Sequence, residues 1–355
     1  MTMNFRSLIT LLVTLLLPLW PVLSQAGESA KPELVILNWA DYIDPDLISA
    51  FERKHHAKVR VINFEDDDNR DQLLLATEGA GYDIVLVNET HVGLYRSHGW
   101  LAEVGDAEVP NLKHVDNAWM DKAKDAKGYA VPYFWGTLGI AYRRDLVKKA
   151  PEHWSDLFLP APDLRGHIAM LSSQREILGM ALKAAGHSVN STEHGEIDEA
   201  MKILVAQKPF VRAYQQALLN EKSELVTGEV SMRMMFNGDA LLLRKFNSNI
   251  DYVVPPEGAA VWVDYMTVMA NAPNPKLAFA FLDFINDPAN AAKNAAYLNF
   301  ATPNVAAAKL MPSEYLKNPS IFPHPDTLAN SELFAPLPPR ALSYRNTQFA
   351  HLLQN

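Results

Sequence analysis

Short apolar runs along the chain alternate with segments in which apolar residues recur with helical spacing. Residues 33–39 and 82–87 are almost continuously apolar, which predicts buried strands, and residues 58–64 alternate apolar and polar side chains. Asp44 followed by Pro45 is a helix start signal, and a second helix is expected over residues 70–78. This order of strands and helices predicts parallel strands joined by crossover helices.

The same alternation continues after Pro132. A chain of 355 residues has the length of about two domains, yet no long flexible linker interrupts the pattern. The chain is therefore expected to pass between two lobes more than once, through short hinge strands. Further strands are predicted over residues 136–142, 165–171, 230–236 and 250–254, and further helices from Glu176 and over residues 196–207, 275–285 and 288–297.

The first 26 residues have the pattern of a secretory signal peptide. Arg6 precedes an apolar run over residues 8–23, and Ser24 and Ala26 supply small residues at the −3 and −1 positions of a cleavage site. A transmembrane anchor is the alternative, but the run is shorter than the ~20 residues that span a bilayer. We expect residues 1–26 to be removed on export. Export of a chain without cysteine favours the bacterial periplasm.

Composition excludes several classes of function. Cys is absent, so disulfides, thiolate chemistry and cysteine-ligated metals are impossible. The net charge is −9, or −10 once Arg6 has left (−9 − 1), and this field repels nucleic acid and attracts cations. The chain has no Gly-rich phosphate loop, dinucleotide fingerprint or nucleophile elbow. No catalytic residue, cofactor or metal ligand is expected, and the acidic run at residues 65–68 is interpreted as a solvated loop.

Aromatic and acidic residues occur together at several predicted strand ends. In open α/β sheets, ligands bind at the carboxyl ends of strands, so these groups would converge on one cleft. Glu176, near a predicted helix start, would add a further carboxylate. The groups in question are Trp39 with Asp41 and Tyr42, Phe236 with Asp239, and Trp262 with Asp264.

Such a cleft suits a chain of methylene groups that bears ammonium groups. Aromatic faces would pack the methylenes and attract the charge, at ~0.5–2 kcal/mol for each ring. Carboxylates would accept charge-assisted hydrogen bonds from the ammonium groups. The same residues would also serve as core aromatics and helix caps, and their spacing alone is compatible with both interpretations.

With these motifs the chain resembles the periplasmic spermidine/putrescine-binding proteins, the substrate-binding subunits of polyamine ABC importers. The resemblance implies an α/β type II periplasmic-binding-protein fold, with one lobe of residues 33–138 plus 263–308 and another of residues 139–262 plus 309–355. It also implies closure of the lobes over the ligand. The motifs are Asn38-Trp39 with Asp41-Tyr42, Val131-Pro132-Tyr133-Phe134-Trp135-Gly136, Arg175-Glu176, Asn237-Gly238, Trp262-Val263-Asp264 and Ala301-Thr302-Pro303-Asn304.

The resemblance extends to single residues of the binding site. Besides the residues above, Phe300 stands where the family usually has Tyr, and Phe236 where it usually has Trp. Asn88 and Glu89 stand where the family has a Ser-x-Tyr or Ser-x-Asp segment, so Glu89 would be an additional acidic residue of the site. The implied partners are a polyamine and an inner-membrane ABC permease, with a monomeric receptor. Some relatives instead sense polyamines and report to a membrane GGDEF/EAL receptor that controls cyclic-di-GMP and biofilm, and this role is the alternative.

Overall fold

The computed structural model describes residues 31–122 and 125–354, so the signal peptide predicted over residues 1–26 lies outside the described residues. The N-terminal strands agree with the prediction. The strand β1 (Glu33–Asn38) pairs in parallel with β2 (Lys58–Asn63) and with β3 (Ile84–Asn88). The crossover helices are α1 (Pro45–His55) and α2 (Asp67–Thr77).

Both crossover helices begin at aspartate caps. Asp44 accepts a hydrogen bond from the backbone N–H of Asp46 (2.9 Å), and Pro45 follows it, as the sequence predicts. Asp66 accepts from the N–H of Asn69 (2.7 Å), so α2 starts before the predicted first residue, Arg70. Part of the acidic run is therefore the first turn of a helix, where negative charge is favourable.

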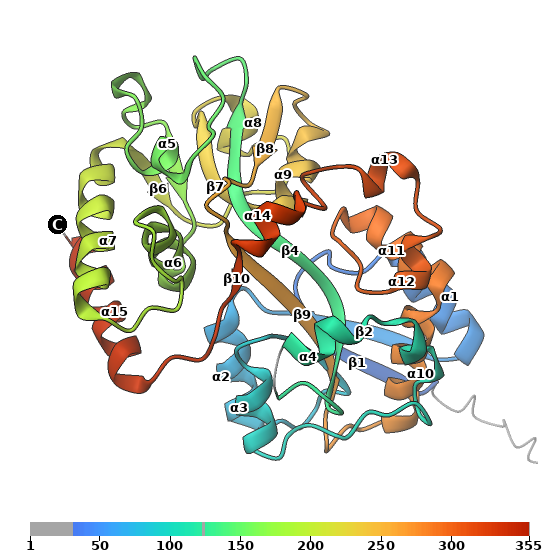
Figure 1. The fold of residues 1–355 in the computed structure, drawn as a ribbon. Helices are drawn as coiled ribbons and strands as arrows, with labels where there is room; N and C mark the ends of the chain where they lie inside the picture. The colour runs from blue at the N-terminus through green and yellow to red at the C-terminus, as the bar shows by residue number, and fades with distance from the viewer. Residues whose placement is uncertain (1–30, 123–124, 355) are drawn as a thin grey trace, which may run out of the picture. The chain divides into compact units, whose positions relative to one another are not determined.

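The sheet as a whole is mixed, so the parallel pairing predicted from the N-terminal strands does not extend to its centre. Its order is β2-β1-β3-β9-β4-β7-β5-β6, with β10 paired to β9 and β8 to β4. The long strands β4 (Ala130–Arg143) and β9 (Ala260–Val268) run antiparallel to each other, side by side through the middle of the sheet (Figure 1). β9 also pairs antiparallel with β3, and β4 with β7 (Met232–Phe236). Parallel pairing is confined to the two flanks and to β10 on β9.

The remaining strands and helices complete the fold. The sequence predicted a strand end at Trp262 and Asp264 but not the full extent of β9, and it did not predict the C-terminal helix α15 (Pro339–Gln354). The other strands are β5 (Ile168–Met170), β6 (Val211–Tyr214), β8 (Ile250–Val253) and β10 (Glu332–Leu333). The other helices are α3 (Val92–Ser97), α4 (Asn117–Lys122), α5 (Trp154–Phe158), α6 (Gln174–Ala184), α7 (His194–Gln207), α8 (Glu224–Thr227), α9 (Asn237–Arg244), α10 (Pro275–Asn286), α11 (Pro288–Leu298), α12 (Val305–Ala308), α13 (Ser313–Leu316) and α14 (Pro325–Ala329), with short 3-10 turns at Pro110–His114, Pro162–Leu164 and Lys208–Phe210.

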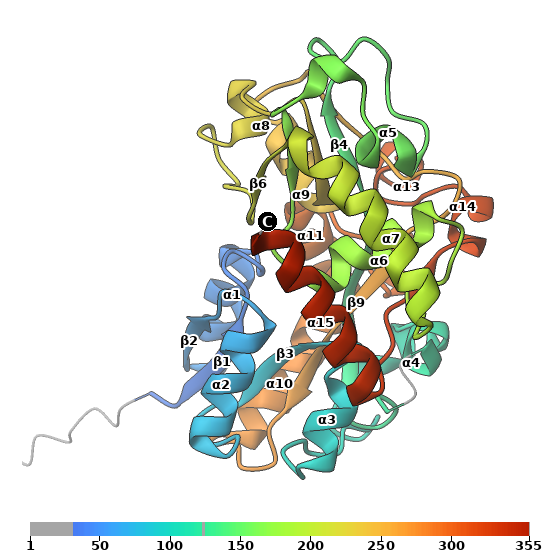
Figure 2. The same cartoon turned by 90° about the vertical axis from the view of Figure 1, so that its left-hand side faces the viewer.

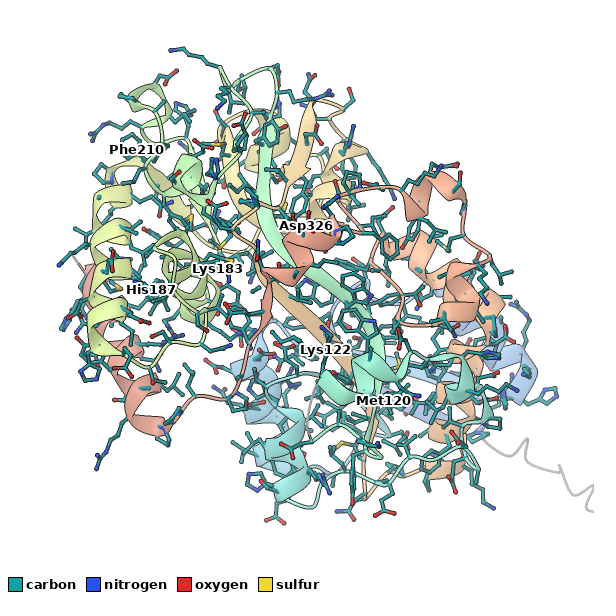
Figure 3. All side chains as sticks on the ribbon, viewed as in Figure 1. Met120, Lys122, Lys183, His187, Phe210 and Asp326 are labelled. Atoms are coloured by element: carbon teal, nitrogen blue, oxygen red, sulfur yellow. The ribbon has the colours of Figure 1, made fainter. Side chains whose placement is uncertain are left out.

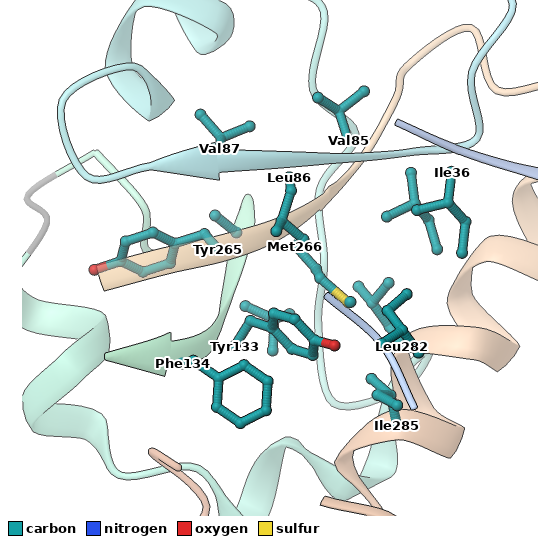
Figure 4. Packing of buried hydrophobic residues seen from close by; sticks show 14 of the residues in the cluster. Ile36, Val85, Leu86, Val87, Tyr133, Phe134, Tyr265, Met266, Leu282 and Ile285 are labelled. Carbon is teal, nitrogen blue, oxygen red and sulfur yellow. The ribbon is translucent and has the colours of Figure 1, made fainter. Parts of the chain in front are cut away.

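Buried side chains form two large hydrophobic cores. The first core packs β1, β3 and α10 against one half of β4 and β9, as the contacts around Leu86 and Met266 in Figure 4 illustrate. The second core packs the other half of β4 against α5, α6, α7 and α15. Within β4 the change from one core to the other falls between Trp135 and Leu138, and within β9 it falls between Ala260 and Val261.

The C-terminal segment returns to the second core. Glu332 of β10 accepts hydrogen bonds from Lys183 at the end of α6 (2.8 Å), labelled in Figure 3, and from Ser188 (2.5 Å). The helix α15 then lies beside α6 and α7 (Figure 2). There the buried guanidinium of Arg345 donates to the backbone carbonyl of Ser191. Within residues 31–122 and 125–354, no helix is both long and apolar enough to cross a membrane.

Candidate functional site

Four of the predicted aromatic residues form a continuous row of rings. Tyr42 packs edge-on against Phe300 (5.7 Å between centroids), which packs edge-on against Trp262 (4.9 Å). Trp262 in turn packs edge-on against Phe236 (6.0 Å). The rings come from the loop after β1, the loop after α11, strand β9 and the end of β7. The fold thus brings distant segments together in one cluster, which we call the aromatic row (Tyr42, Phe300, Trp262 and Phe236).

Two glycines allow the rings to lie close to the backbone. A Cβ atom at Gly136 on β4 would stand only 2.5 Å from Cζ2 of Trp262. A Cβ atom at Gly238, in the first turn of α9, would collide with the ring of Phe300. Since real Cβ atoms do not approach other heavy atoms this closely, both rings occupy space that only glycine leaves open.

Asp264 lies in the middle of β9, which corrects its predicted place at a strand end. The strand continues past it because β9 pairs on both sides, with Asn88 of β3 and Phe134 of β4 opposite Asp264. The hydroxyl of Tyr42 donates a hydrogen bond to Oδ2 of Asp264 (3.0 Å). Burial raises the pKa of Asp264 to about 7, against the lowering effect of that hydrogen bond.

Glu89 places a second carboxylate beside Asp264. Its Oε2 accepts from the backbone N–H of Val263 (3.2 Å), while its buried Oε1 has no hydrogen-bond partner among the described residues. Burial raises the pKa of Glu89 to about 7, with Arg175 opposing the shift. The preceding residue, Asn88, is held in place by a hydrogen bond from its side-chain amide to Oδ2 of Asp67 (2.6 Å).

Glu176 is held by its neighbour in the first turn of α6. Its Oε1 accepts hydrogen bonds from Nε (2.8 Å) and Nη2 (2.5 Å) of Arg175. The buried Oε2 has no partner within the part of the chain that the structure describes. Arg175 was not predicted as a site residue, although it stands next to Glu176 in a quoted motif. An arginine beside a carboxylate is too common a pair to signal this role by itself.

Asp239 lies at the far end of the aromatic row, in the first turn of α9 just after Phe236. Burial raises its pKa to about 7, and the charge of Arg233 opposes the rise. The negative charge of Asp239 contributes in turn to the raised pKa of Tyr42, after burial and the closer Asp264. Asp239 and Asp264 are therefore within electrostatic reach of the same tyrosine.

Two predicted residues, Trp39 and Asp41, have no ring contact or side-chain hydrogen bond with the aromatic row or its carboxylates within the described ranges. The ring of Trp39 packs against Phe64 (4.3 Å between centroids) and is half-buried. Asp41 is exposed and adopts a left-handed backbone conformation (φ 54°). Tyr42, the next residue, is buried in the aromatic row. Of the first predicted segment, Tyr42 therefore belongs to the aromatic row, whereas Trp39 and Asp41 lie outside it.

The site offers acceptors and ring faces rather than a reactive group. Glu89 and Glu176 each present a buried carboxylate oxygen without a partner among residues 31–122 and 125–354. Of these two residues, Glu89 interacts electrostatically with Asp264. Over the same residues, no group of three or more His, Asp or Glu side chains is arranged to hold a metal ion. Such carboxylates are stabilised by hydrogen-bond donors that carry positive charge.

The two hydrophobic cores share the long strands β4 and β9, and Trp262 of the aromatic row and Asp264 both lie on β9. This architecture is that of a solute-binding protein. The chain belongs to the bacterial extracellular solute-binding protein family, whose model matches residues 46–323. It is 31% identical over 320 residues to the norspermidine sensor of Vibrio cholerae, spanning 90% of this chain and 88% of that protein. It is 29% identical over 312 residues to the spermidine/putrescine-binding periplasmic protein of Escherichia coli K12, spanning 87% of this chain and 88% of that protein.

Solved structures agree with this assignment. The spermidine/putrescine ABC transporter substrate-binding protein of Streptococcus pneumoniae has a TM-score of 0.81 and 28% identity, covering 91% of this chain and 99% of that one. A putative spermidine/putrescine ABC transporter protein of Listeria monocytogenes has a TM-score of 0.80 and 32% identity, with the same coverage. The predicted type II periplasmic-binding-protein fold and the family are confirmed. The family and these neighbours are substrate-binding proteins rather than enzymes.

Proposed function

We propose that this protein binds a polyamine of the putrescine, spermidine and norspermidine class between two lobes. One lobe comprises residues 33–138 plus 263–308, and the other comprises residues 139–262 plus 309–355. The observation that supports this most strongly is the aromatic row flanked by the carboxyl groups of Glu89, which is buried, and of Asp239 and Asp264, which are partly buried. Desolvation raises the pKa values of all three to about 7.

The chemistry of a polyamine matches each part of that site. Its methylene chain would lie along the rings. This contact would favour binding through burial of apolar surface and through attraction between the rings and the nearby ammonium charges. Its ammonium groups would donate to Asp264 and Glu89 at one end of the row and to Asp239 at the other. Buried carboxylates without a counter-charge are unfavourable, so a cation with two or more charges relieves several of them at once.

The proposed place of action is the periplasm, after a signal peptide is cleaved near Ala26. There the loaded receptor, as a monomer, would deliver its amine to an inner-membrane ABC permease. The similarity to the Escherichia coli spermidine/putrescine-binding periplasmic protein and to the Streptococcus pneumoniae transporter protein supports this role.

A sensor is the second candidate. In this role the loaded protein would bind a membrane signalling receptor of the GGDEF/EAL type and change cyclic-di-GMP levels. The 31% identity to the norspermidine sensor of Vibrio cholerae, over 90% of this chain, favours it. The amine site would be the same for both roles, and only the docking surface would differ.

Ligand screening by thermal shift and calorimetry tests the amine site. The purified mature chain is mixed with putrescine, spermidine, norspermidine, amino acids and sugars. A ligand at 100 times its dissociation constant should stabilise the protein by ~2.7 kcal/mol. Asp239→Asn should weaken amine binding by ~2–5 kcal/mol, because it leaves a bound ammonium without its partner. Asp163→Asn, at an exposed pair with Lys148 (2.8 Å), removes the same charge and should have no effect.

One outcome of this screen would refute the proposal. A response to a sugar or an amino acid with no response to any amine would exclude a polyamine receptor. Importer and sensor are separated in the native bacterium by deleting the gene. Loss of labelled polyamine uptake identifies the importer, while unchanged uptake with altered biofilm identifies the sensor.

A further inference from the structure

Asn294 is a buried amide in the middle of helix α11. The other buried residues of this helix are alanines, namely Ala291, Ala292 and Ala295. Asn is a poor helix former in a helix interior, and a buried amide is unfavourable unless its polar atoms are paired. Both polar atoms of Asn294 are paired with segments that lie far away in the chain, so its role is not confined to its own helix.

The two hydrogen bonds of Asn294 hold the loop that carries Tyr42. Oδ1 of Asn294 accepts from the backbone N–H of Asp44 (2.9 Å), and Nδ2 donates to the hydroxyl of Tyr133 (2.7 Å). Tyr133 in turn donates its hydroxyl proton to the backbone carbonyl of Tyr42 (2.8 Å). A flipped amide would set Nδ2 against the N–H of Asp44, with two donors facing each other, so only one orientation of the amide fits.

Tyr133 lies at a β-bulge of β4. Pro132 of β4 pairs with Tyr265 of β9. The next pair is Phe134 with Asp264, so Tyr133 is an extra residue without a partner in β9. A bulge of this kind changes the direction of a side chain relative to the regular strand. The residue that Asn294 contacts therefore stands at an irregular point of the strand, beside the residue that pairs with Asp264.

The loop between β1 and α1 needs such an anchor, because its conformation is irregular. Asp41, directly before Tyr42, adopts the left-handed region (φ 54°), which is unfavourable for residues other than glycine. The Tyr42 hydroxyl donates to Oδ2 of Asp264 (3.0 Å), and the Tyr42 ring packs edge-on against Tyr133 (5.5 Å between centroids). A shift of this loop would therefore withdraw the hydroxyl from Asp264.

Resting on the polyamine site proposed above, we propose that Asn294 is a positioning residue of that site. Through Tyr133 and the backbone of Asp44, it fixes the position of Tyr42. The Tyr42 hydroxyl then holds Oδ2 of Asp264 and leaves Oδ1 to accept an ammonium group. A carboxylate that is already held in one orientation binds its ligand with a smaller loss of conformational freedom. Asn294 acts on the ligand only through Tyr42.

This role predicts a change in the pH dependence of binding. The hydrogen bond from Tyr42 lowers the pKa of Asp264, in opposition to burial. Loss of that bond would raise the pKa of Asp264 further, and an ammonium group binds the ionised carboxylate. The pH at which amine affinity falls should therefore move upwards when Asn294 no longer holds Tyr42. A residue that only stabilises the fold would not move it.

Calorimetry with 1,4-diaminobutane over a range of pH around 7 tests the proposal on the mature chain. Asn294→Leu removes both hydrogen bonds and should weaken binding by roughly tenfold or more, the effect of losing one hydrogen bond to a charged group. It should also move the pH midpoint of affinity upwards. Tyr133→Phe keeps the ring and should produce the same two changes. Asn286→Leu removes a buried amide that donates to the Leu282 carbonyl (2.8 Å), and should lower stability without changing affinity or midpoint.

A double variant tests whether Asn294 acts through Tyr42. Tyr42→Phe removes the hydroxyl and should by itself raise the pH midpoint of affinity. In that background Asn294→Leu should add little to the shift, because the hydrogen bond that it positions is already absent.

Two results would overturn the inference and leave a polyamine receptor in place. One is an unmoved pH midpoint in Asn294→Leu and Tyr133→Phe, whether or not binding becomes weaker. The other is a full additional shift when Asn294→Leu is combined with Tyr42→Phe. If Asn294→Leu did not fold, the midpoint of Tyr133→Phe would decide alone. Failure of the unaltered chain to bind any amine would instead refute the proposed function, and the inference with it.

Discussion

Replacing Asp264 by Asn should make the ligand-free protein more stable and the amine complex weaker. The substitution preserves the shape of the side chain and an oxygen that can accept the Tyr42 hydroxyl, now 3.0 Å from Oδ2. It removes a negative charge whose burial raises the pKa of Asp264 from 3.8 to about 7. The two effects have opposite signs because the charge is unfavourable alone and favourable beside an ammonium group.

The magnitude and its pH dependence follow from that pKa. Because the folded state holds the proton up to about pH 7 and the unfolded chain releases it near pH 4, the unaltered protein loses stability as the pH rises between these values. About 3 pKa units correspond to ~4 kcal/mol. Asp264 is only partly buried, so solvent screening reduces this, and we expect a gain of ~1–3 kcal/mol for the variant at pH 8.

Urea denaturation at pH 4.5 and pH 8, without ligand, measures this difference. The gain in the free energy of unfolding should be largest at pH 8 and clearly smaller at pH 4.5, where the folded protein keeps the proton. Asp145→Asn is the matched control with the opposite sign, because Arg143 (2.7 Å) lowers the pKa of Asp145 and its charge is stabilising. Calorimetry with 1,4-diaminobutane should show binding weakened by ~2–5 kcal/mol. Equal effects at both pH values, or unchanged amine affinity, would refute the reasoning.

Three further predictions concern the site and its scaffold. Amine affinity should fall as the pH drops through about 7, because the carboxyl groups of Glu89, Asp239 and Asp264 take up protons. Calorimetry in buffers of different ionisation enthalpy should detect proton release on binding. Gly238→Ala should destabilise the fold by ~1–3 kcal/mol and weaken amine binding by displacing Phe300, whereas Gly195→Ala, with open space around it, should do neither in the same assays. Arg345→Met should lower the free energy of unfolding in urea by ~1–3 kcal/mol, since it leaves buried backbone carbonyls without a donor, and an unchanged denaturation midpoint would contradict this.

Local pattern was sufficient to predict the elements whose signals lie within a few neighbouring residues. The apolar runs became β1 and β3, and the Asp44-Pro45 signal became the start of α1. The extent and pairing of β9 were missed, because its partners β3 and β4 are far away in the chain and no turn signal marks a hairpin. The antiparallel centre of the sheet was missed for the same reason.

The sequence by itself determined which chemical groups the site has available: rings and carboxylates in short motifs such as Trp262 with Asp264, and no cysteine. Only the tertiary structure decided which of them meet. It buried Tyr42 and left Asp41 exposed, and it brought Arg175 of α6 to Thr90, a residue 85 positions earlier in the chain. The physical reason is that burial, which raises the carboxyl pKa values, and ion pairing depend on neighbours supplied by distant parts of the chain.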